Sequence, residues 1–467
     1  MSAAGGRLTR LAVWGVWGAM LIIALACIAR WGRNIPLAED WTLVAPLTGH
    51  ERSIPAWLWS QNNEHRVPLP RFVLLGLLAL TGGDFRAGMV ANALVLAAVA
   101  AAMARTAAQL RGGARWSDAF FPVLFLHIGN WENLVWGWQL QFTLSAALTC
   151  VLLLAAVSAR EINGRRALAA AAAIVLLPLC GANGLIFALA MAPWAMYVAL
   201  RQWRGGGAAP ADLSSGATDR PSPNDANRRA ALVLGAAAIV AVLLVGVYFV
   251  GYERPYWVPP NPGRRATVET AAKFAAMAFG PAVSAHWEPA IAAAVLVLVP
   301  TLLLLLVRAL REWRAASAER ERSLGLVCFA GGTVVLTLAM GYGRAAYVPE
   351  IGMPSRYVLL AAPALCVAYL VWELYGGPAM RRIAPAALLV AMAALLPANT
   401  RSGFGWRDWY VNGMRAVEQD IAAGVPRVEL ARRHHKFLLH WNERLCGEAI
   451  GWLRDRGRRS PFGAVRG

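Results

Sequence analysis

Long apolar runs alternate along the chain with shorter polar segments that are rich in arginine or in aromatic residues. A helix needs roughly 20 mostly apolar residues to cross the hydrocarbon core of a bilayer. The apolar runs, separated by polar loops, predict about 11 crossings. The predicted crossings lie at 11–29, 85–104, 120–127, 140–158, 167–179, 185–200, 230–250, 291–307, 324–340, 358–372 and 383–396. The pattern therefore predicts an all-α, polytopic membrane protein.

The arginines of the polar segments predict how the crossings are oriented. Basic residues concentrate in the cytoplasmic loops of membrane proteins, and here they cluster in every loop assigned to that side, such as 105–115 and 308–322. Arg7 and Arg10 precede the first run, which places the amino terminus inside and residues 36–70 outside. A cleaved signal peptide is the alternative, because the residues before Cys27 resemble a cleavage site.

Three stretches stand apart from the crossings. Residues 201–229 are rich in Gly, Pro, Ser, Asp and Arg, which predicts a flexible cytoplasmic linker within a transmembrane domain at 1–397. Residues 398–467 form a basic tail with amphipathic helical stripes. The number of crossings places this tail on the outer side, whereas its charge alone predicts the inner side. The short run at 71–81 predicts a juxtamembrane helix on the outer surface.

The composition supports the membrane assignment and excludes several classes of protein. Of the 467 residues, 58% are hydrophobic and only 15% are charged, against about 25% charged in soluble domains. The net charge of +19 lies largely in the short loops, so it does not indicate nucleic-acid binding. Five of the six cysteines lie in apolar runs, without a disulfide framework. Phosphate-loop and zinc-protease motifs are missing, and the crossings lack the acids of ion-coupled transporters.

An acidic pair follows the first crossing, where Glu39 and Asp40 precede Trp41. Apolar surroundings at a membrane surface raise the pKa of a carboxyl group and make it a usable general base. We therefore predict Asp40, together with Glu39, as the catalytic pair. The alternative is that the two acids only keep a loop hydrated or cap a short helix.

A second polar group lies at Glu64, His65 and Arg66. The planar fork of an arginine matches phosphate oxygens, which predicts a substrate contact for Arg66. Glu64 and His65 are ligand types for a divalent cation such as Mg²⁺ or Mn²⁺, but two ligands are too few to define a metal site. The alternative is a local ion pair that orients the helix after Pro68.

Two further outer segments carry candidate substrate contacts. Arg344 and Arg356, the latter beside Tyr357, stand at the outer ends of neighbouring crossings, where they could clamp a phosphate at headgroup depth. The alternative is that they only anchor helices at the interface. The other segment is a turn that combines aromatic and amide side chains, as sugar-binding sites do, although tryptophan is also common as a plain interfacial residue. It comprises Trp131, Glu132, Asn133 and Gln139.

Taken in order, these segments resemble the GT-C glycosyltransferases, a superfamily that includes protein O-mannosyltransferases and lipid A aminoarabinose transferases. Glu39-Asp40 matches the acidic pair after the first crossing, and residues 65–86 match the short surface helix that follows it. EDW, NEHR, WENLxWGxQ and SRY segments resemble those of uncharacterised bacterial relatives, and the last two stand here at 131–139 and 355–357. The sequence has His-Arg-Val-Pro where the family usually has His-Pro-Pro.

The resemblance implies a GT-C-like bundle in the bacterial inner membrane, with its active site facing the periplasm. A sugar would pass from a polyprenyl-phosphate donor to a glycan, lipid or protein acceptor, without a certain cofactor. Asp40 would deprotonate the acceptor, and Arg344 and Arg356, with Arg66 as a further candidate, would stabilise the leaving phosphate. A non-catalytic lipid-linked glycan flippase, an envelope-assembly protein and a surface-polysaccharide polymerase or ligase remain alternatives.

Overall fold

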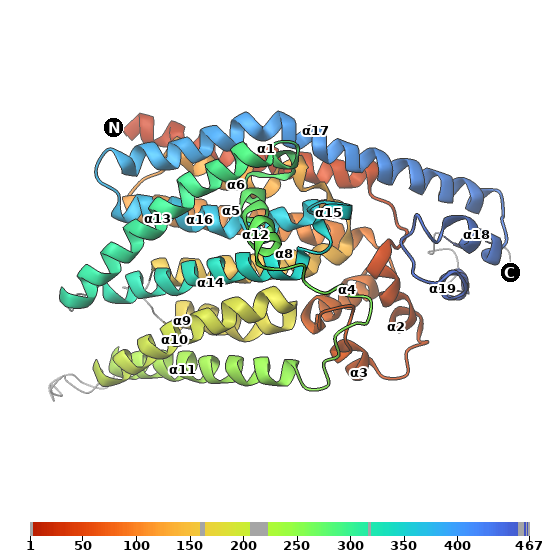
Figure 1. Ribbon diagram of the computed structural model, residues 1–467, viewed down its shortest axis with the longest axis horizontal. Coiled ribbons are helices and arrows are strands. Elements are labelled where there is room, and N and C mark those ends of the chain that lie inside the picture. The colour runs from red at the N-terminus through yellow and green to blue at the C-terminus, as the bar shows by residue number, and fades with distance from the viewer. Residues whose placement is uncertain are drawn as a thin grey trace.

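The computed structural model describes residues 3–158, 164–205, 223–315 and 319–455, together with Phe462, Gly463 and Val465. Every named element in these residues is a helix (Figure 1). The long helices are α1 (Ala3–Trp31), α5 (Arg86–Arg111), α8 (Leu140–Val157), α10 (Ala182–Gly205), α11 (Pro223–Tyr248), α13 (Trp287–Ala315), α14 (Arg320–Arg344), α16 (Val358–Tyr375) and α17 (Met380–Ala422).

Shorter helices connect them, and those with 3-10 geometry are labelled η. They are η1 (Ala38–Leu43), α2 (Val44–Thr48), α3 (Ile54–Trp59), α4 (Pro68–Leu80), η2 (Trp116–Ala119), α6 (Phe120–Leu126), η3 (Ile128–Asn130), α7 (Trp131–Val135), η4 (Gly137–Gln139), α9 (Gly164–Leu176), η6 (Leu177–Cys180), α12 (Arg264–Ala276), η7 (Met277–Phe279), η8 (Pro281–Ala285), α15 (Val348–Ile351), η9 (Ser355–Tyr357), α18 (Arg427–His434) and α19 (Glu443–Asp455).

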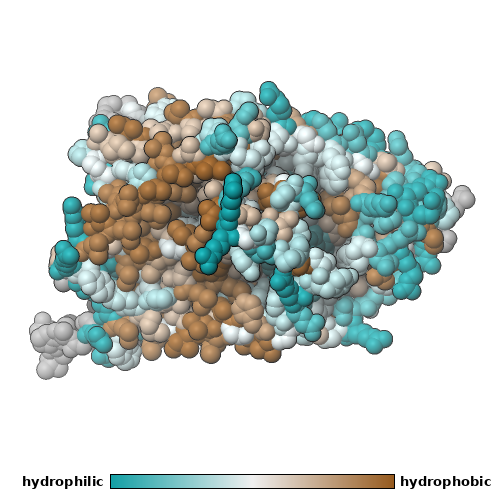
Figure 2. Space-filling model, viewed as in Figure 1, coloured by the Kyte–Doolittle hydropathy of each residue, from teal (hydrophilic) through white to brown (hydrophobic). Residues whose placement is uncertain are grey.

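Nine helices of the described chain are long and apolar enough to cross a membrane. They coincide with nine of the predicted crossings and indicate a multi-pass membrane protein, as the sequence predicted. On the face shown in Figure 2, hydrophobic residues cover much of the molecule, and hydrophilic residues gather at the end that carries α18 and α19. Unpaired backbone groups are costly in lipid, so helices that satisfy their own hydrogen bonds suit this band.

The two remaining predicted crossings, 120–127 and 167–179, correspond to the shorter helices α6 and α9. Helix α6 packs against α1, α5 and α17, and the chain then continues through the short helices η3, α7 and η4 before α8 begins. Helix α9 packs mainly against α11 and α8 and continues into η6. Both segments are therefore part of the bundle, although each is shorter than the nine long helices.

The segment between the first two long helices and the carboxyl-terminal helices meet at one end of the bundle (Figure 1). Helix α17 has 43 residues, which corresponds to about 65 Å, and it reaches from the bundle to this end. The predicted domain boundary at 397/398 falls within α17, so the tail continues a membrane helix instead of starting a separate one. Helix α19 packs against α2, and the Ala38 N–H donates to the Leu438 carbonyl at 2.8 Å.

The surface helix and the linker were also predicted from the sequence. The surface helix predicted at 71–81 is present as α4, which begins at Pro68, a residue suited to a first helical turn. Helices α10 and α11 occupy both ends of the predicted linker 201–229, and residues 206–222 lie outside the described residues. The polar segment 36–70 and helix α4 thus frame the end of the bundle where the tail is attached.

Candidate functional site

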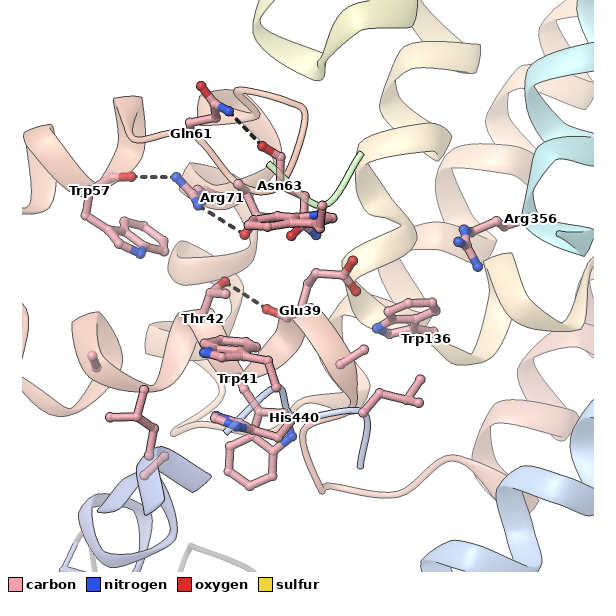
Figure 3. Close-up of a pocket in the computed structure, with 18 of the residues that line it drawn as sticks. Glu39, Trp41, Thr42, Trp57, Gln61, Asn63, Arg71, Trp136, Arg356 and His440 are labelled. Carbon is pink, nitrogen blue, oxygen red and sulfur yellow. Dashed lines mark hydrogen bonds between the residues drawn. The ribbon is translucent and has the colours of Figure 1, made fainter. Parts of the chain in front are cut away.

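A cavity of about 1110 Å³ lies at this polar end (Figure 3). We name it the aromatic cavity, because eight tryptophans contribute to its lining. They come from η1, α3, the turn before η4, the loop before α12, α17 and the tail. Several of these rings are only partly covered by protein, since Trp257 is 55% and Trp441 64% exposed. Large apolar surface that faces water on a folded protein often marks a binding site.

Glu39 is the member of the predicted acidic pair that lines the aromatic cavity, and Glu51 and Glu132 line it as well. Its side chain is half-buried, and its Oε2 atom has no hydrogen-bond partner. Burial raises the pKa of the Glu39 carboxyl, the charge of Arg356 opposes this, and the charge of Glu132 adds to it. In Figure 3 the carboxyl group lies between η1 and Trp136, on the side of the cavity that also carries Arg356. This is the environment expected of a general base.

Asp40, the predicted partner of Glu39, has a different position. It is 3% exposed and does not line the described cavities. Its Oδ2 accepts a hydrogen bond from the Leu37 N–H at 3.4 Å. Burial raises the pKa of Asp40 to about 8, whereas hydrogen bonds from the Leu37 and Trp138 backbones lower it. Asp40 therefore caps the short helix η1, which was the alternative interpretation of the sequence. Glu39 is the member of the pair that lines the cavity.

Arg356 is held at the cavity by Glu132. The Glu132 carboxylate accepts hydrogen bonds from Arg356 Nη1 at 2.6 Å, from the Arg356 N–H at 2.9 Å and from Ser355 Oγ at 2.6 Å. Asn133 donates through Nδ2 to the Arg356 carbonyl at 3.1 Å. The two predicted segments 131–139 and 355–357 are thus joined directly. Charge-assisted bonds of this kind fix both position and orientation.

A smaller cavity of about 360 Å³ lies next to the Glu132–Arg356 pair and is lined by residues of α8, α10, α14 and α16. Arg344 lies in its wall and pairs with Glu64 at 3.1 Å. The guanidinium groups of Arg344 and Arg356 lie 5.7 Å and 5.5 Å from the centroid of the Tyr357 ring. His65 also lines this cavity, and burial followed by the charge of Arg344 lowers its pKa to about 4. Tyr357 therefore connects the two predicted arginines.

Arg66 requires a correction, because the structure does not leave it available to a phosphate. Its guanidinium donates to the carbonyl oxygens of Tyr248, Val250 and Gly251 at the end of α11, at 2.9–3.0 Å, and to the Trp59 carbonyl at 2.7 Å. Basic groups stabilise the carboxyl-terminal end of a helix in this way. Arg66 thus joins segment 36–70 to α11 and lies outside the lining of the described cavities.

Two residues of the predicted sugar-binding turn also need correction. Trp131 and Gln139 are fully buried and do not line the described cavities. Trp131 packs against Trp31 of α1, with ring centroids 5.5 Å apart. Trp136 of the same segment faces the cavity instead (Figure 3). The turn contributes Glu132 and Trp136 to the cavity, while its other side chains fill the wall behind it.

Strained backbone concentrates around the aromatic cavity. Within the described chain, three residues other than glycine have positive φ angles: Ala38 at 48°, Asn63 at 50° and Leu439 at 55°. All three line the cavity. Such conformations cost on the order of 1–3 kcal/mol each and are found mainly at functional sites. Here they position Glu39, the turn around Asn63, and the tail residue His440.

Arg71 and His440 were not among the predicted site residues, although both line the cavity. Arg71 donates to the carbonyls of Trp57 and Ser60 at 2.6 and 2.7 Å, and burial lowers its pKa to about 10. His440 accepts from the Asn442 N–H at 3.1 Å through Nδ1, so the neutral ring carries its proton on Nε2. The sequence offered a signal for Arg71, an arginine within an apolar run, but none that placed the tail beside Trp41.

Metal binding finds no support in the geometry. Among the residues that the structure describes, no group of three His, Cys, Asp or Glu side chains could hold a metal ion. Glu64 and His65 both line the smaller cavity, where Glu64 pairs with Arg344 at 3.1 Å.

Comparisons with known proteins give no family for this chain. No family model, curated protein or solved structure matches it.

Proposed function

We propose that the protein transfers a sugar from a polyprenyl-phosphate donor to an acceptor hydroxyl in the aromatic cavity. One observation carries this proposal: the carboxyl group of Glu39 and the guanidinium group of Arg356 line the same large cavity. The Oε2 atom of Glu39 has no hydrogen-bond partner. A carboxyl and a guanidinium are the two groups that glycosyl transfer from a lipid phosphate needs, one to accept a proton and one to stabilise the leaving phosphate. The lining of indole rings suits the apolar faces of a sugar.

In the proposed reaction, the Glu39 carboxylate accepts the proton of the acceptor hydroxyl. The acceptor oxygen forms a bond with the anomeric carbon as the bond from that carbon to the phosphate oxygen breaks. The bonding electrons leave with the lipid phosphate, and the anomeric centre is inverted. Within the described chain, Glu132 uses only Nη1 of the Arg356 side chain, so its other N–H groups remain available to the phosphate.

The smaller cavity suits the lipid end of the donor. It lies between membrane helices and is lined by apolar residues such as Leu336 and Met340, with Arg344 at its wall. A phosphate near Tyr357 would be within reach of both Arg344 and Arg356, because their guanidinium groups lie on the same ring. The isoprenoid chain would then remain between helices while the sugar enters the aromatic cavity.

The membrane topology is part of this proposal. Counting α6 with α7 and α9 with η6 as crossings gives the predicted total of about 11. The arginine-rich loops then face the cytoplasm of a bacterial inner membrane, and the aromatic cavity faces the periplasm. The carboxyl-terminal tail lies on the same side as the cavity, because its residues help to line it.

Glu39 and Asp40 offer a matched test of the chemistry. Removal of a general base lowers turnover by about 10²- to 10⁴-fold, so we expect this loss for Glu39→Gln. Asp40→Asn leaves the acid at the cavity in place, and we expect it to keep turnover within about tenfold of the wild type. Sugar transfer or release from a panel of polyprenyl-phosphate sugars by the purified protein in lipid nanodiscs provides the measurement.

A Glu39→Gln protein that folds normally and keeps the wild-type rate contradicts the role of Glu39. A large loss of turnover for Asp40→Asn, together with full activity of Glu39→Gln, would identify Asp40 as the base, as predicted from the sequence. A flippase needs neither acid, so lipid-linked glycan translocation that is equally fast in both variants, without sugar release, would favour the non-catalytic alternative.

A further inference from the structure

A second large cavity lies near the amino terminus of α1. Figure 1 shows that this terminus and the tail helices α18 and α19 lie at opposite ends of the bundle. It has a volume of about 870 Å³ and is formed by the start of α1, the end of α5 and the loop that leads to η2. We name it the basic cavity, because its lining includes five arginines and one acid. These are Arg7, Arg10, Arg105, Arg111, Arg115 and Asp118.

Two of the five arginines are neutralised by buried acids. Arg111 lies 3.1 Å from Glu373, and it also donates to Asp118 Oδ1 at 2.6 Å. Arg115 pairs with Glu373 at 3.2 Å. These four side chains form a network between α5, η2 and α16 that holds the floor of the basic cavity. The network is structural, since its charges balance within it.

The other three arginines have no carboxylate partner within the described residues. Arg7 and Arg10 are one helical turn apart on α1, and Trp14 follows one turn later, so the three share a face. Arg105 of α5 lies over the Trp14 ring, 5.1 Å from its centroid. Three exposed positive charges are thus collected around one cavity without carboxylate partners, and such a cluster attracts anions.

The remaining lining points to a lipid as the source of the anion. Val13, Ala104 and Ala108 form an apolar part of the wall, and both contributing helices belong to the nine apolar helices. A soluble anion would gain nothing from this apolar surface, whereas a phospholipid places its glycerol and first methylene groups there. Basic pockets between membrane helices bind anionic lipid headgroups in this manner.

We infer that the basic cavity binds the headgroup of an anionic phospholipid, with Arg7, Arg10 and Arg105 contacting its phosphate oxygens. Arginine offers paired N–H donors that match phosphate oxygens, and three of them around one cavity suit a headgroup with two phosphates, such as that of cardiolipin, better than one phosphate. Bound there, the lipid would tie the start of α1 to the end of α5. This inference does not depend on the proposed glycosyl transfer.

Lipid binding can be measured on the full-length protein by native mass spectrometry after reconstitution with cardiolipin, phosphatidylglycerol or phosphatidylcholine. We expect adducts with cardiolipin, weaker ones with phosphatidylglycerol and none above background with phosphatidylcholine. Because each arginine near a headgroup contributes about one kcal/mol, the triple variant Arg7→Ala/Arg10→Ala/Arg105→Ala should bind cardiolipin on the order of 100-fold more weakly.

The chain offers a control that removes the same charge outside the cavity. Arg311 and Arg314 of α13 and Arg382 of α17 are exposed, and none of them lines the basic cavity. The variant Arg311→Ala/Arg314→Ala/Arg382→Ala should bind cardiolipin as the wild type does. Equal losses in the two triple variants would show general charge attraction and overturn the site. Displacement of cardiolipin by millimolar pyrophosphate would show a site for soluble phosphate and would also overturn the assignment to lipid.

Discussion

The aromatic cavity and the basic cavity lie at opposite ends of one helical bundle and differ in three respects. Acids and arginines are mixed in the first, whereas three arginines without acidic partners dominate the second. Eight tryptophans contribute to the first and one to the second. Positive φ angles outside glycine occur around the first and, within the described chain, nowhere in the second. The two cavities therefore suit different tasks at the two ends of the bundle.

Under the two proposals, this difference separates a site for chemistry from a site for attachment. A reacting site needs groups whose charges change during the reaction, and it holds them with strained backbone and buried partners. A lipid-binding site needs only permanent charge on stable helices. The Glu132–Arg356 pair and the half-buried carboxyl group of Glu39 meet the first requirement, and the helical face of Arg7, Arg10 and Trp14 meets the second.

Disruption of the Glu132–Arg356 pair should have the largest effect on stability. Glu132 is 4% exposed and accepts three hydrogen bonds from Ser355 and Arg356. Removing one partner of a fully buried pair costs roughly 3–5 kcal/mol, which is an upper limit here because the Arg356 side chain is 31% exposed. We therefore expect Glu132→Gln to lower the thermal midpoint clearly. Arg105→Ala removes an exposed arginine of the basic cavity and should change stability by no more than about 0.5 kcal/mol.

A thiol-reactive dye can follow unfolding in detergent, because the cysteines are free and five of them are buried. Similar midpoints for Glu132→Gln and Arg105→Ala would remove the distinction between the two ends.

A glycine-to-alanine change should loosen the tail wall of the aromatic cavity alone. A Cβ atom on Gly413 would collide with the ring of Phe437, which packs on Trp409 of the cavity at a centroid distance of 5.2 Å. Overpacking costs about 1–3 kcal/mol. In the same helix, Gly405 has open space around it, and Gly405→Ala should be neutral or slightly stabilising.

The readout is site-resolved labelling of cysteines by mass spectrometry. Gly413→Ala should speed the reaction of Cys446, which is buried in α19, and leave Cys27 of α1 unchanged. Equal acceleration at both thiols would indicate global destabilisation instead of a local opening of the tail.

The pH dependence of stability provides the smallest and most specific effect. The folded protein keeps a proton on Asp40 up to a pKa of about 8, whereas the unfolded chain releases it near the ordinary value of 3.8. The folded state therefore binds more protons between these values, and stability falls as pH rises through this window. Asp40→Asn should flatten this fall by on the order of a few degrees in the thermal midpoint between pH 5 and pH 8.

A remaining slope is expected in Asp40→Asn, because burial shifts the pKa of Glu39 in the same direction. Asp408→Asn, which changes an exposed aspartate, should keep the wild-type slope. Identical slopes in the wild type and Asp40→Asn would show that Asp40 is ionised in the folded protein.

Sequence patterns predicted the membrane helices and the residue types of the site better than the role of each residue. Apolar length alone identifies nine long helices, since a bilayer accepts little else. The acids after the first crossing and Arg356 were recognised as candidates because charge is rare near lipid. Which of two adjacent acids faces the cavity depends on the left-handed turn at Ala38, and no local pattern specifies that turn. Arg66 was misjudged because its partners are carbonyl oxygens about 180 residues away.

The sequence by itself therefore determined that this chain is a helical membrane protein, that its polar groups gather in a few segments, and that arginine marks alternate loops. Periodicity and hydropathy act over one helix length, so a sequence reports them directly. Only the tertiary structure decided that the tail closes over segment 36–70, that Glu132 holds Arg356, and that Glu39 rather than Asp40 faces the cavity. These outcomes depend on contacts between residues far apart in the chain, where packing and burial, not local preference, select the arrangement.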